Sequence, residues 1–418
     1  MKHIKPLFQH PITFNSMLKK RPYNILYIST LCSPQVLDYI FETSVVKPGL
    51  AIQKFHRLLV EGLSSINETY VESLSSLPVI YSSHKRRIWM IKSERINNIR
   101  FNYIPIINLP FIKNSIVVIY TFIKVLIQNV FINTNKKIVI CDVLNLSMSI
   151  SALLACKLTN TKIIALVTDL PGLMISSLQN GNTIYSSLAN SIISKFDGYI
   201  LLTDQMNAVV NPKNRPYMIM EGLVDISMNS SENHLCHKAK ERIILYAGGL
   251  YEKYGIVKLI EAFRLLPDID LLLYIYGTGE METEMPSYML IDNRIKYMGV
   301  VPNNEVVMMQ IKATLLINPR PTIEEFTKYS FPSKTMEYLV SGTPLVTTRL
   351  PGITKEYNEF VYFLDDESLN GIYSTLKILL SKPKEELHEF GLKAKTFVLK
   401  EKSNIIQGSK VLNFLNTY

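Results

Sequence analysis

The chain has 418 residues, of which 47% are apolar and 19% are charged, and its mean hydropathy is +0.14. This length fits two large domains and excludes a single small binding module, while the apolar fraction excludes intrinsic disorder. The net charge of +10 comes from residues 1–230, which carry 23 Lys and Arg against 12 Asp and Glu, whereas residues 231–418 carry 22 against 23. No nucleic-acid-binding motif is present, so we expect the basic half to meet an anionic membrane surface and no nucleic acid.

The first residues and the cysteines favour a cytoplasmic protein. Lys2 and Pro6 interrupt the region in which a secretory signal would have its apolar core. The four cysteines are far apart and include no Cys-x-x-Cys pair, so we expect neither a disulfide framework nor a metal site. The most apolar stretch, residues 116–132, contains Lys124 and two side-chain amides. A buried or membrane-grazing helix is therefore expected there instead of a membrane span.

Short apolar runs alternate with segments of helical periodicity, a pattern typical of parallel sheets covered by helices. In the first half, helices are predicted at residues 49–62 and 147–158, and strands at residues 25–29, 88–91, 101–104, 137–141, 162–167 and 198–202. In the second half, a helix is predicted at 254–265 and strands at 242–247, 271–276, 295–298, 314–318 and 344–347. After residue 366 only helices are expected. The α/β pattern therefore occurs twice.

This repetition predicts an α/β protein with two Rossmann-like, doubly wound domains facing a central cleft. The polar segment 226–240, rich in Ser, Asn, His and Lys, has little periodicity and is the predicted linker. We expect an acceptor-binding, membrane-facing domain over residues 1–225 and a donor-binding domain over residues 241–395. Residues 396–418 are expected to form a helix that packs back on the first domain.

Ligands of such sheets bind outside the carboxyl ends of the strands, so the residues that follow each strand are the first candidates. Gly248 and Gly249 follow one predicted strand, and Lys253 stands near the start of the next helix, where a cation can neutralise a phosphate. Gly277 and Gly279 follow the next strand. Taken alone, the first segment fits a tight βα turn with a solvated lysine better than a ligand site. The second is a lone Gly-x-Gly that lacks the complete dinucleotide-binding fingerprint.

The segment 318–342 places several charged groups beside a helix start. Arg320 follows a predicted strand, and Ser333 is expected to cap the helix that continues with Lys334 and Glu337. A helix N-terminus with free amides, a cation and a carboxylate one turn later suits a nucleotide diphosphate sugar. The alternative is a capped amphipathic helix with an internal Lys–Glu pair.

Six short motifs occur in order at residues 221–225, 248–255, 259–263, 276–280, 297–301 and 331–344. Together they resemble the motifs of family 4 glycosyltransferases, which are retaining enzymes of the GT-B fold. The resemblance is specific over about residues 198–365.

This resemblance implies that Lys253 contacts the donor phosphates and that Glu337 binds the nucleotide ribose. It also implies that the backbone of Val300 and Val301 meets the base, and that no metal or other cofactor is needed.

Two positions depart from the family pattern. The usual arginine is replaced by Gly249, and the first motif glutamate is replaced by Tyr329. Arg320 and Lys334 are our candidates for the missing positive charge.

In the first half, the family's histidine near the transferred sugar corresponds to Thr168, with Asp169 beside it. Asp169 is a candidate to orient or deprotonate an acceptor hydroxyl, and it is equally an ordinary turn residue. Thr30 after the first strand, with Lys54 and His56 on the next helix, is expected to border the acceptor side. A solvated helix face is the alternative for these residues.

We therefore expect a retaining glycosyltransferase that moves a sugar from a nucleotide diphosphate donor to a lipid-linked or envelope glycan, such as a capsule, lipopolysaccharide or exopolysaccharide precursor. It is expected to act at the inner face of the cytoplasmic membrane. Two alternatives remain open: a nucleotide-sugar epimerase of similar fold, and an inactive GT-B scaffold that binds membrane or partner proteins. The replacements at Thr168, Gly249 and Tyr329 favour the inactive scaffold.

Overall fold

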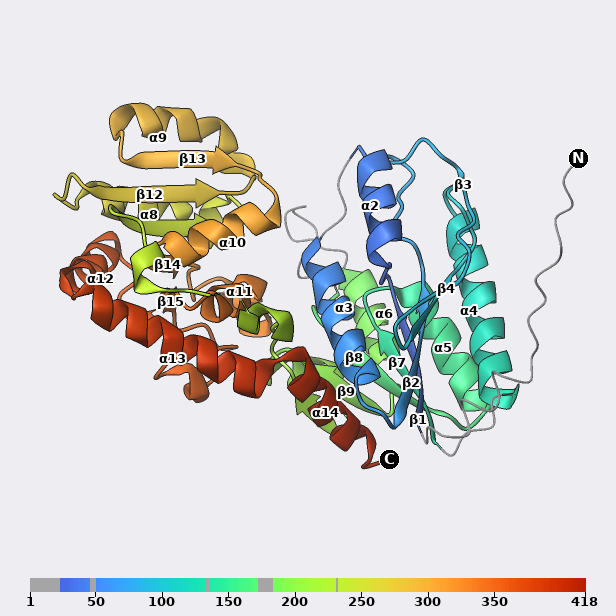
Figure 1. Ribbon diagram of the computed structural model, residues 1–418. Helices are drawn as coiled ribbons and strands as arrows, with labels where there is room; N and C mark the ends of the chain where they lie inside the picture. The colour runs from blue at the N-terminus through green and yellow to red at the C-terminus, as the bar shows by residue number, and fades with distance from the viewer. Residues whose placement is uncertain (1–22, 46–49, 132–135, 172–182, 231) are drawn as a thin grey trace, which may run out of the picture. The chain divides into compact units, whose positions relative to one another are not determined.

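The computed structural model describes residues 23–45, 50–131, 136–171, 183–230 and 232–418 (Figure 1). Their contacts divide the chain into two compact units. Unit 1 contains the chain up to residue 201, residues 209–218 and residues 407–418, while unit 2 contains residues 202–208 and 219–406. Lys2 and Pro6, on which the expectation of no secretory signal rests, lie outside the described residues.

Unit 1 contains an eight-stranded sheet with the strand order β10-β9-β8-β7-β1-β2-β5-β4. From β1 outward, the order through β2 and β5 on one side and β7, β8 and β9 on the other is that of a Rossmann fold. The strands are β1 (Tyr23–Ser29), β2 (Thr69–Ser75), β4 (Glu94–Ile96), β5 (Ile99–Tyr103), β7 (Lys136–Asp142), β8 (Lys162–Val167), β9 (Gly198–Leu201) and β10 (Tyr217–Ile219). A separate antiparallel pair consists of β3 (Ile88–Trp89) and β6 (Ile106–Ile107).

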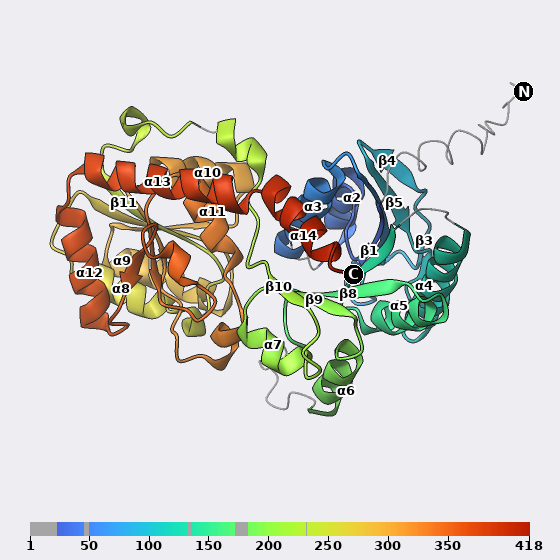
Figure 2. The same cartoon turned by 90° about the horizontal axis from the view of Figure 1, so that it is seen from below.

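Helices cover both faces of this sheet, with α3 and α14 on one face and α4 and α5 on the other (Figure 2). The helices of this unit are α2 (Pro34–Thr43), α3 (Leu50–Ser64), α4 (Ile112–Phe131), α5 (Leu146–Leu158), α6 (Thr183–Ile193) and, from residue 407 on, α14 (Asn404–Leu415). Most of the short helix α7 (Gln205–Val210) belongs to unit 2. By length and composition, α4 could cross a membrane, a property that core helices of soluble proteins share.

Unit 2 contains a six-stranded sheet with the order β13-β12-β11-β14-β15-β16, again that of a Rossmann fold, and its registered pairs are parallel. The strands are β11 (Arg242–Ala247), β12 (Leu271–Tyr276), β13 (Ile295–Gly299), β14 (Leu315–Asn318), β15 (Leu345–Thr348) and β16 (Tyr362–Leu364). Both units thus have the Rossmann-like, doubly wound architecture that the sequence predicts.

Alternation along β11 explains why this sheet is covered on both faces. Ile244 and Tyr246 join one buried cluster, and Ile243 and Leu245 join the other. The first cluster includes α8 (Ile256–Arg264), α9 (Met285–Ile291) and α12 (Leu369–Ser381). The second includes α10 (Asn303–Lys312), α11 (Ser333–Ser341) and α13 (Lys384–Lys402). The short 3-10 helices of this unit are η2 (Ile226–Ser230), η3 (Leu235–His237), η4 (Glu252–Tyr254), η5 (Glu280–Glu284), η6 (Glu325–Tyr329) and η7 (Lys355–Tyr357).

Several expectations need correction. Residues 69–75 form β2, an interior strand that was not predicted from the sequence, and the strand expected at 88–91 is only two residues long. Residues 226–240 lie inside unit 2, where the buried Asn233 amide donates to the Ser341 carbonyl at 2.8 Å. Residues 396–418 belong to two helices instead of one, because the helical conformation is interrupted at Ser403 between α13 and α14.

Candidate functional site

In unit 2 the strand order reverses between β11 and β14, which lie side by side. In open α/β sheets, ligands bind outside the carboxyl ends of the strands at this point. The residues that follow β11 are Gly248 and Gly249, and Arg320 lies two residues beyond β14. The sheet topology therefore places three of the predicted donor-binding residues at the expected crevice.

Arg320 and Lys253 come together around two aromatic rings. The Arg320 Cζ atom lies 4.4 Å from the centroid of the Tyr254 ring and 5.5 Å from that of Phe326. The Lys253 Nζ atom lies 5.9 Å from each of the same two centroids. Both cations thus pack on one aromatic pair, whose own ring centroids are 6.0 Å apart.

Neither cation has an acidic partner among the described residues. The Nε atom of Arg320 is buried without a hydrogen bond, and burial lowers the pKa of this guanidinium below its ordinary value. An arginine nevertheless stays protonated in a protein, so its charge is held in place without compensation. Two cations without a carboxylate, on rigid aromatic supports, are suited to bind an anion.

Gly255 explains how Lys253 reaches Arg320. Its φ is +80°, and a Cβ atom at this position would lie 2.1 Å from the Pro319 carbonyl oxygen. Only glycine permits this approach, which brings η4 against the residue that precedes Arg320. The glycine therefore serves the geometry of the cation pair, although it contacts no cation itself.

Gly277 and Gly279 allow the loops that follow β11 and β12 to pack closely together. A Cβ atom on Gly277 would lie 1.9 Å from the Gly248 oxygen, and one on Gly279 would lie 2.4 Å from the Leu250 oxygen. The amide of Leu250 donates to the Thr278 carbonyl at 2.9 Å. Close packing of the two loops is thus sufficient to explain Gly277 and Gly279, and their role in donor binding remains a prediction.

Gly249 replaces the family's arginine without a compensating side chain on the same loop. A Cβ atom there would lie 2.9 Å from the Tyr251 ring, so an arginine would require this tyrosine to move. The Gly249 carbonyl accepts a hydrogen bond from the Tyr246 hydroxyl at 2.7 Å. The cations near this loop are therefore Lys253 and Arg320 instead of a residue at position 249.

The start of α11 differs from the expectation in its cap. Ser333 is the first helical residue and is exposed, whereas Pro332 occupies the cap position and no side chain caps the helix. The expected Ser333 cap is wrong, because proline already stands where a capping hydroxyl would be needed. Lys334 and Glu337 do lie together, with 3.3 Å between Nζ and Oε2.

Tyr338 fixes this helix to the end of β11. Its hydroxyl oxygen accepts from the Ala247 amide at 2.7 Å, and its O–H donates to the Ala247 carbonyl at 3.2 Å. Tyr338 is fully buried, and Ala247 directly precedes Gly248. The helix that carries Lys334 and Glu337 is therefore positioned rigidly against the glycine loop.

The residues predicted to meet the base follow β13. Val300 is 73% exposed, and Val301 is half-buried. Tyr329 ends η6, the 3-10 helix that contributes Phe326 to the cation pair. Val300, Val301 and Tyr329 therefore follow the same end of the sheet as Arg320.

In unit 1 the structure places the three residues predicted to border the acceptor in different surroundings. Thr30 follows β1, and its carbonyl accepts from the Gln53 amide at 2.6 Å, so this loop is tied to α3. His56 is fully buried, with its Nδ1 atom 2.6 Å from the Tyr27 hydroxyl and its Nε2 atom 3.3 Å from an Asp142 oxygen. His56 therefore cannot touch an acceptor, because it faces the sheet.

Lys54 lies on the same helix, one residue after Gln53 and two before His56, and its side chain is partly exposed. It is thus the only helix residue of the predicted acceptor set that solvent reaches. A role in acceptor binding remains a prediction for Lys54 and Thr30.

Asp169 is the titratable candidate in unit 1. It lies two residues after β8, and burial raises its pKa to about 6, although the Leu170 amide donates to its Oδ1 atom at 2.9 Å. The adjacent Thr168 hydroxyl is buried and has no hydrogen-bond partner in the part of the chain that the structure describes. A carboxyl with this pKa can exchange a proton near neutral pH.

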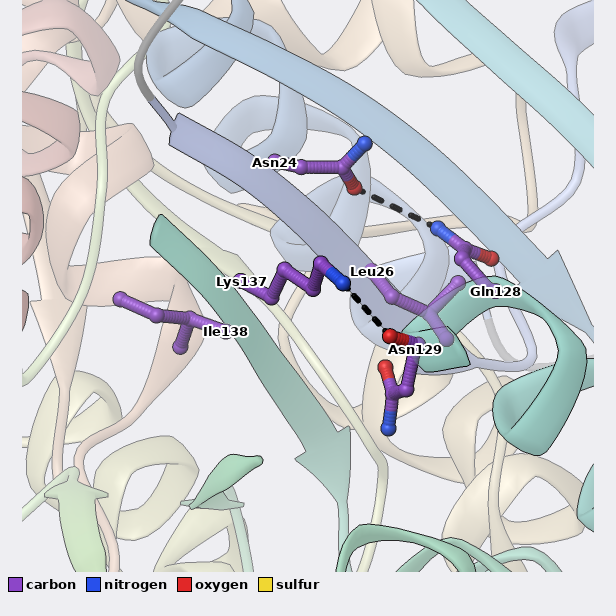
Figure 3. A pocket seen from close by; sticks show the side chains of 6 residues that line it. All are labelled: Asn24, Leu26, Gln128, Asn129, Lys137 and Ile138. Atoms are coloured by element: carbon purple, nitrogen blue, oxygen red, sulfur yellow. Dashed lines mark hydrogen bonds between the residues drawn. The ribbon is translucent and has the colours of Figure 1, made fainter. Parts of the chain in front are cut away.

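A small polar pocket in unit 1 lies elsewhere (Figure 3). Asn24 and Lys137 line it near the amino ends of β1 and β7, together with Gln128 and Asn129 of α4. This is the sheet edge opposite Thr30 and Asp169, so the pocket is not part of the candidate site. Among the described residues, no group of three or more His, Cys, Asp or Glu side chains could hold a metal ion.

Tyr254 and Phe326, the aromatic support of the cation pair, were not predicted from the sequence. Tyr254 directly precedes Gly255, so its place at a helix mouth was visible from the sequence. Phe326 is 72 residues further along the chain, and no sequence signal joins it to Tyr254. The pairing depends on the chain approach at Gly255.

Comparisons with known proteins agree with this architecture. Residues 229–397 match the family model for glycosyl transferases group 1. No curated protein matches the chain significantly. Sucrose-phosphate synthase from Thermosynechococcus elongatus has a similar structure, with a TM-score of 0.66 and 13% identity over 94% of this chain and 99% of that one.

Two further structures cover the same 94% of this chain and 99% of their own. Anabaena HepE, solved in complex with UDP and glucose, has a TM-score of 0.58 and 10% identity. The lipopolysaccharide outer core galactosyltransferase WaaB has a TM-score of 0.59 and 13% identity. The chain thus has the GT-B fold of glycosyltransferases, and its second unit matches the glycosyl transferases group 1 family.

Proposed function

We propose that the protein is a retaining, family 4-like glycosyltransferase that uses a nucleotide diphosphate sugar. The observation that carries the proposal is the pair of cations without acidic partners, Arg320 and Lys253, at the switch point of the second sheet. A diphosphate supplies the negative charge that this pair lacks. As the donor bond breaks, the same cations stabilise the charge that develops on the leaving diphosphate.

The remaining donor contacts come from α11 and the β13 loop. Free amides at the start of α11 and the Lys334 ammonium add positive potential, and Glu337 accepts from ribose hydroxyls. Val300 and Val301 meet the base. No metal ion takes part in this scheme, since the protein cations carry the diphosphate charge.

For the acceptor we propose a lipid-linked or envelope glycan, used at the inner face of the cytoplasmic membrane. Asp169, with a pKa of about 6, orients or deprotonates the acceptor hydroxyl, and Thr30 and Lys54 border it. The basic first half and the unpaired cysteines support this location.

A panel of UDP-, GDP-, ADP- and dTDP-sugars tests the proposal by calorimetric binding and by product analysis. We expect one donor to bind and to release its nucleoside diphosphate when a lipid extract is present. An epimerised donor without release would instead identify an epimerase. Binding of none of these donors would favour the inactive scaffold, which Gly249, Thr168 and Tyr329 suggest, and would contradict our proposal.

A further inference from the structure

The polarity of α4 is inverted relative to an ordinary helix on the surface of a soluble domain. Its side that faces the sheet carries polar groups: Lys124 pairs with the buried Glu72 at 2.8 Å, and the Asn129 amide donates to the Thr159 hydroxyl at 2.9 Å. Gln128 is also buried, beside Asn24 (Figure 3). The polar side chains on this face of α4 therefore make their contacts inside unit 1.

The outward side of α4 and its neighbour α5 is apolar. On each helix, three exposed aliphatic residues recur at a spacing of four, so each set forms one stripe. The two helices cover the same face of the sheet (Figure 2). We call these six residues the α4–α5 apolar face: Ile119, Ile123 and Ile127, with Ile150, Leu154 and Leu158.

The charges around this face have one sign. Residues 73–168, which include both helices, contain twelve Lys and Arg but only two carboxylates, Glu94 and Asp142. Asp142 is 2% exposed, and Glu94 is half-buried and accepts hydrogen bonds from Ser33 and Tyr103. Lys157, by contrast, is exposed within the α5 stripe. The described part of this stretch thus combines an apolar helix face with a large excess of cations, and neither of its two carboxylates is fully exposed.

We propose that the α4–α5 apolar face docks in the interfacial layer of an anionic lipid bilayer. Aliphatic side chains enter the headgroup and acyl boundary while the surrounding Lys and Arg meet the lipid phosphates. A second copy of the chain fits less well, because self-association would oppose two cationic rims. The contacts of Lys124 and Asn129 hold α4 on the sheet, so it lies along the membrane instead of crossing it.

Vesicle co-sedimentation of the full chain tests this surface, with vesicles of phosphatidylcholine alone or with about 30% phosphatidylglycerol. We expect I119S/I123S/I127S to lower partitioning into anionic vesicles by about tenfold or more. The matched control I269S/I291S/I378S removes three exposed isoleucines from unit 2 and should bind as the wild type does. Raising the salt concentration should weaken wild-type binding.

A second pair of variants keeps the test valid if the triple substitution impairs folding. Trp89 is fully buried, so a tryptophan added at Ile123 reports separately on its surroundings. Ile123→Trp should shift its emission to the blue and be quenched by brominated lipids, whereas Ile378→Trp should not. Equal partitioning of both triple variants, no quenching at position 123, or a dimer that I119S/I123S/I127S converts to monomers without any vesicle binding would each overturn the proposal. The proposal is independent of the donor site, whose nucleotide binding is measured without lipid.

Discussion

Arg320 lies over the ring of Tyr254, with 4.4 Å between its Cζ atom and the ring centroid, and this contact organises the candidate donor site. The tyrosine supports the guanidinium from one side while no carboxylate neutralises it. A positive charge that is fixed in position without a counter-ion favours the binding of an anion, and it does not stabilise the free protein.

Arg320→Met and Lys253→Ala should therefore weaken nucleoside diphosphate binding by about ten- to a hundredfold, the effect of losing one charge-assisted hydrogen bond. The free energy of unfolding of Arg320→Met should not fall, because the substitution removes a partly desolvated charge. Calorimetry and urea unfolding measure the two quantities. Lys312→Ala, an exposed lysine on α10, is the control. Unchanged affinity in both site variants would refute the assignment.

Glu337→Gln separates ligand binding from helix stability. Glu337 is partly buried and pairs with the more exposed Lys334, so the pair itself contributes less than about 1 kcal/mol to stability. If Glu337 accepts from ribose, the variant loses donor affinity several-fold with nearly unchanged unfolding. A loss of stability with full affinity would show that the pair is only structural.

Asp169 should make stability depend on pH. Burial raises its pKa from 3.8 to about 6, so between these values the folded state binds the proton more tightly than the unfolded state. The contribution of Asp169 to the free energy of unfolding should therefore be fully present below about pH 4 and be lost as the pH rises through 6. Asp169→Asn should remove this component in urea unfolding at pH 4.5 and 7.5, while Asn at the exposed Asp268 should not.

Lys402 forms a buried ion pair at the end of α13. Its Nζ atom lies 2.5 Å from Glu221 and 2.7 Å from Glu356, and the Tyr357 hydroxyl donates to Glu221 at 2.7 Å. Although burial opposes its charge, the carboxylates hold the pKa of Lys402 above its ordinary value.

Lys402→Met leaves Glu221 buried without its cation and should cost about 3 to 5 kcal/mol in the unfolding of unit 2. Adding Glu221→Gln should recover part of this loss, because a neutral amide still accepts from Tyr357. Lys400→Met, on the same helix but exposed, is the matched control. Equal effects of the two lysine substitutions in thermal and urea unfolding would contradict the prediction.

The sequence predicts the repetitive part of this fold well, because apolar periodicity is local. The strands β8, β11 and β12 have the expected bounds. The central strand β2 escaped prediction since its sequence includes Glu72 and two serines, which are all buried. Glu72 is tolerated there only because Lys124 and Asn102 contact it, and neither partner is close in sequence.

The candidate site was likewise predicted only where it depends on local sequence patterns. Motif order singled out Lys253 and Glu337, Arg320 was chosen because it follows a predicted strand, and the Lys334–Glu337 pair follows from helical spacing. The Ser333 cap and the accessible His56 were wrong, since one depends on where the helix begins and the other on which helix face the sheet covers. Such details depend on packing between distant segments.

A sugar-transfer assay tests most directly whether the protein is a retaining glycosyltransferase. The full chain would be incubated with a radiolabelled nucleotide diphosphate sugar, chosen from the donor panel, and a polyprenyl-linked glycan acceptor in anionic vesicles. We predict label in the lipid fraction, equimolar release of nucleoside diphosphate, and an anomeric configuration identical to that of the donor. Arg320→Met should abolish the label. An unlabelled lipid fraction with every donor that binds would contradict transfer to a lipid-linked acceptor. A product of inverted configuration would contradict the retaining mechanism.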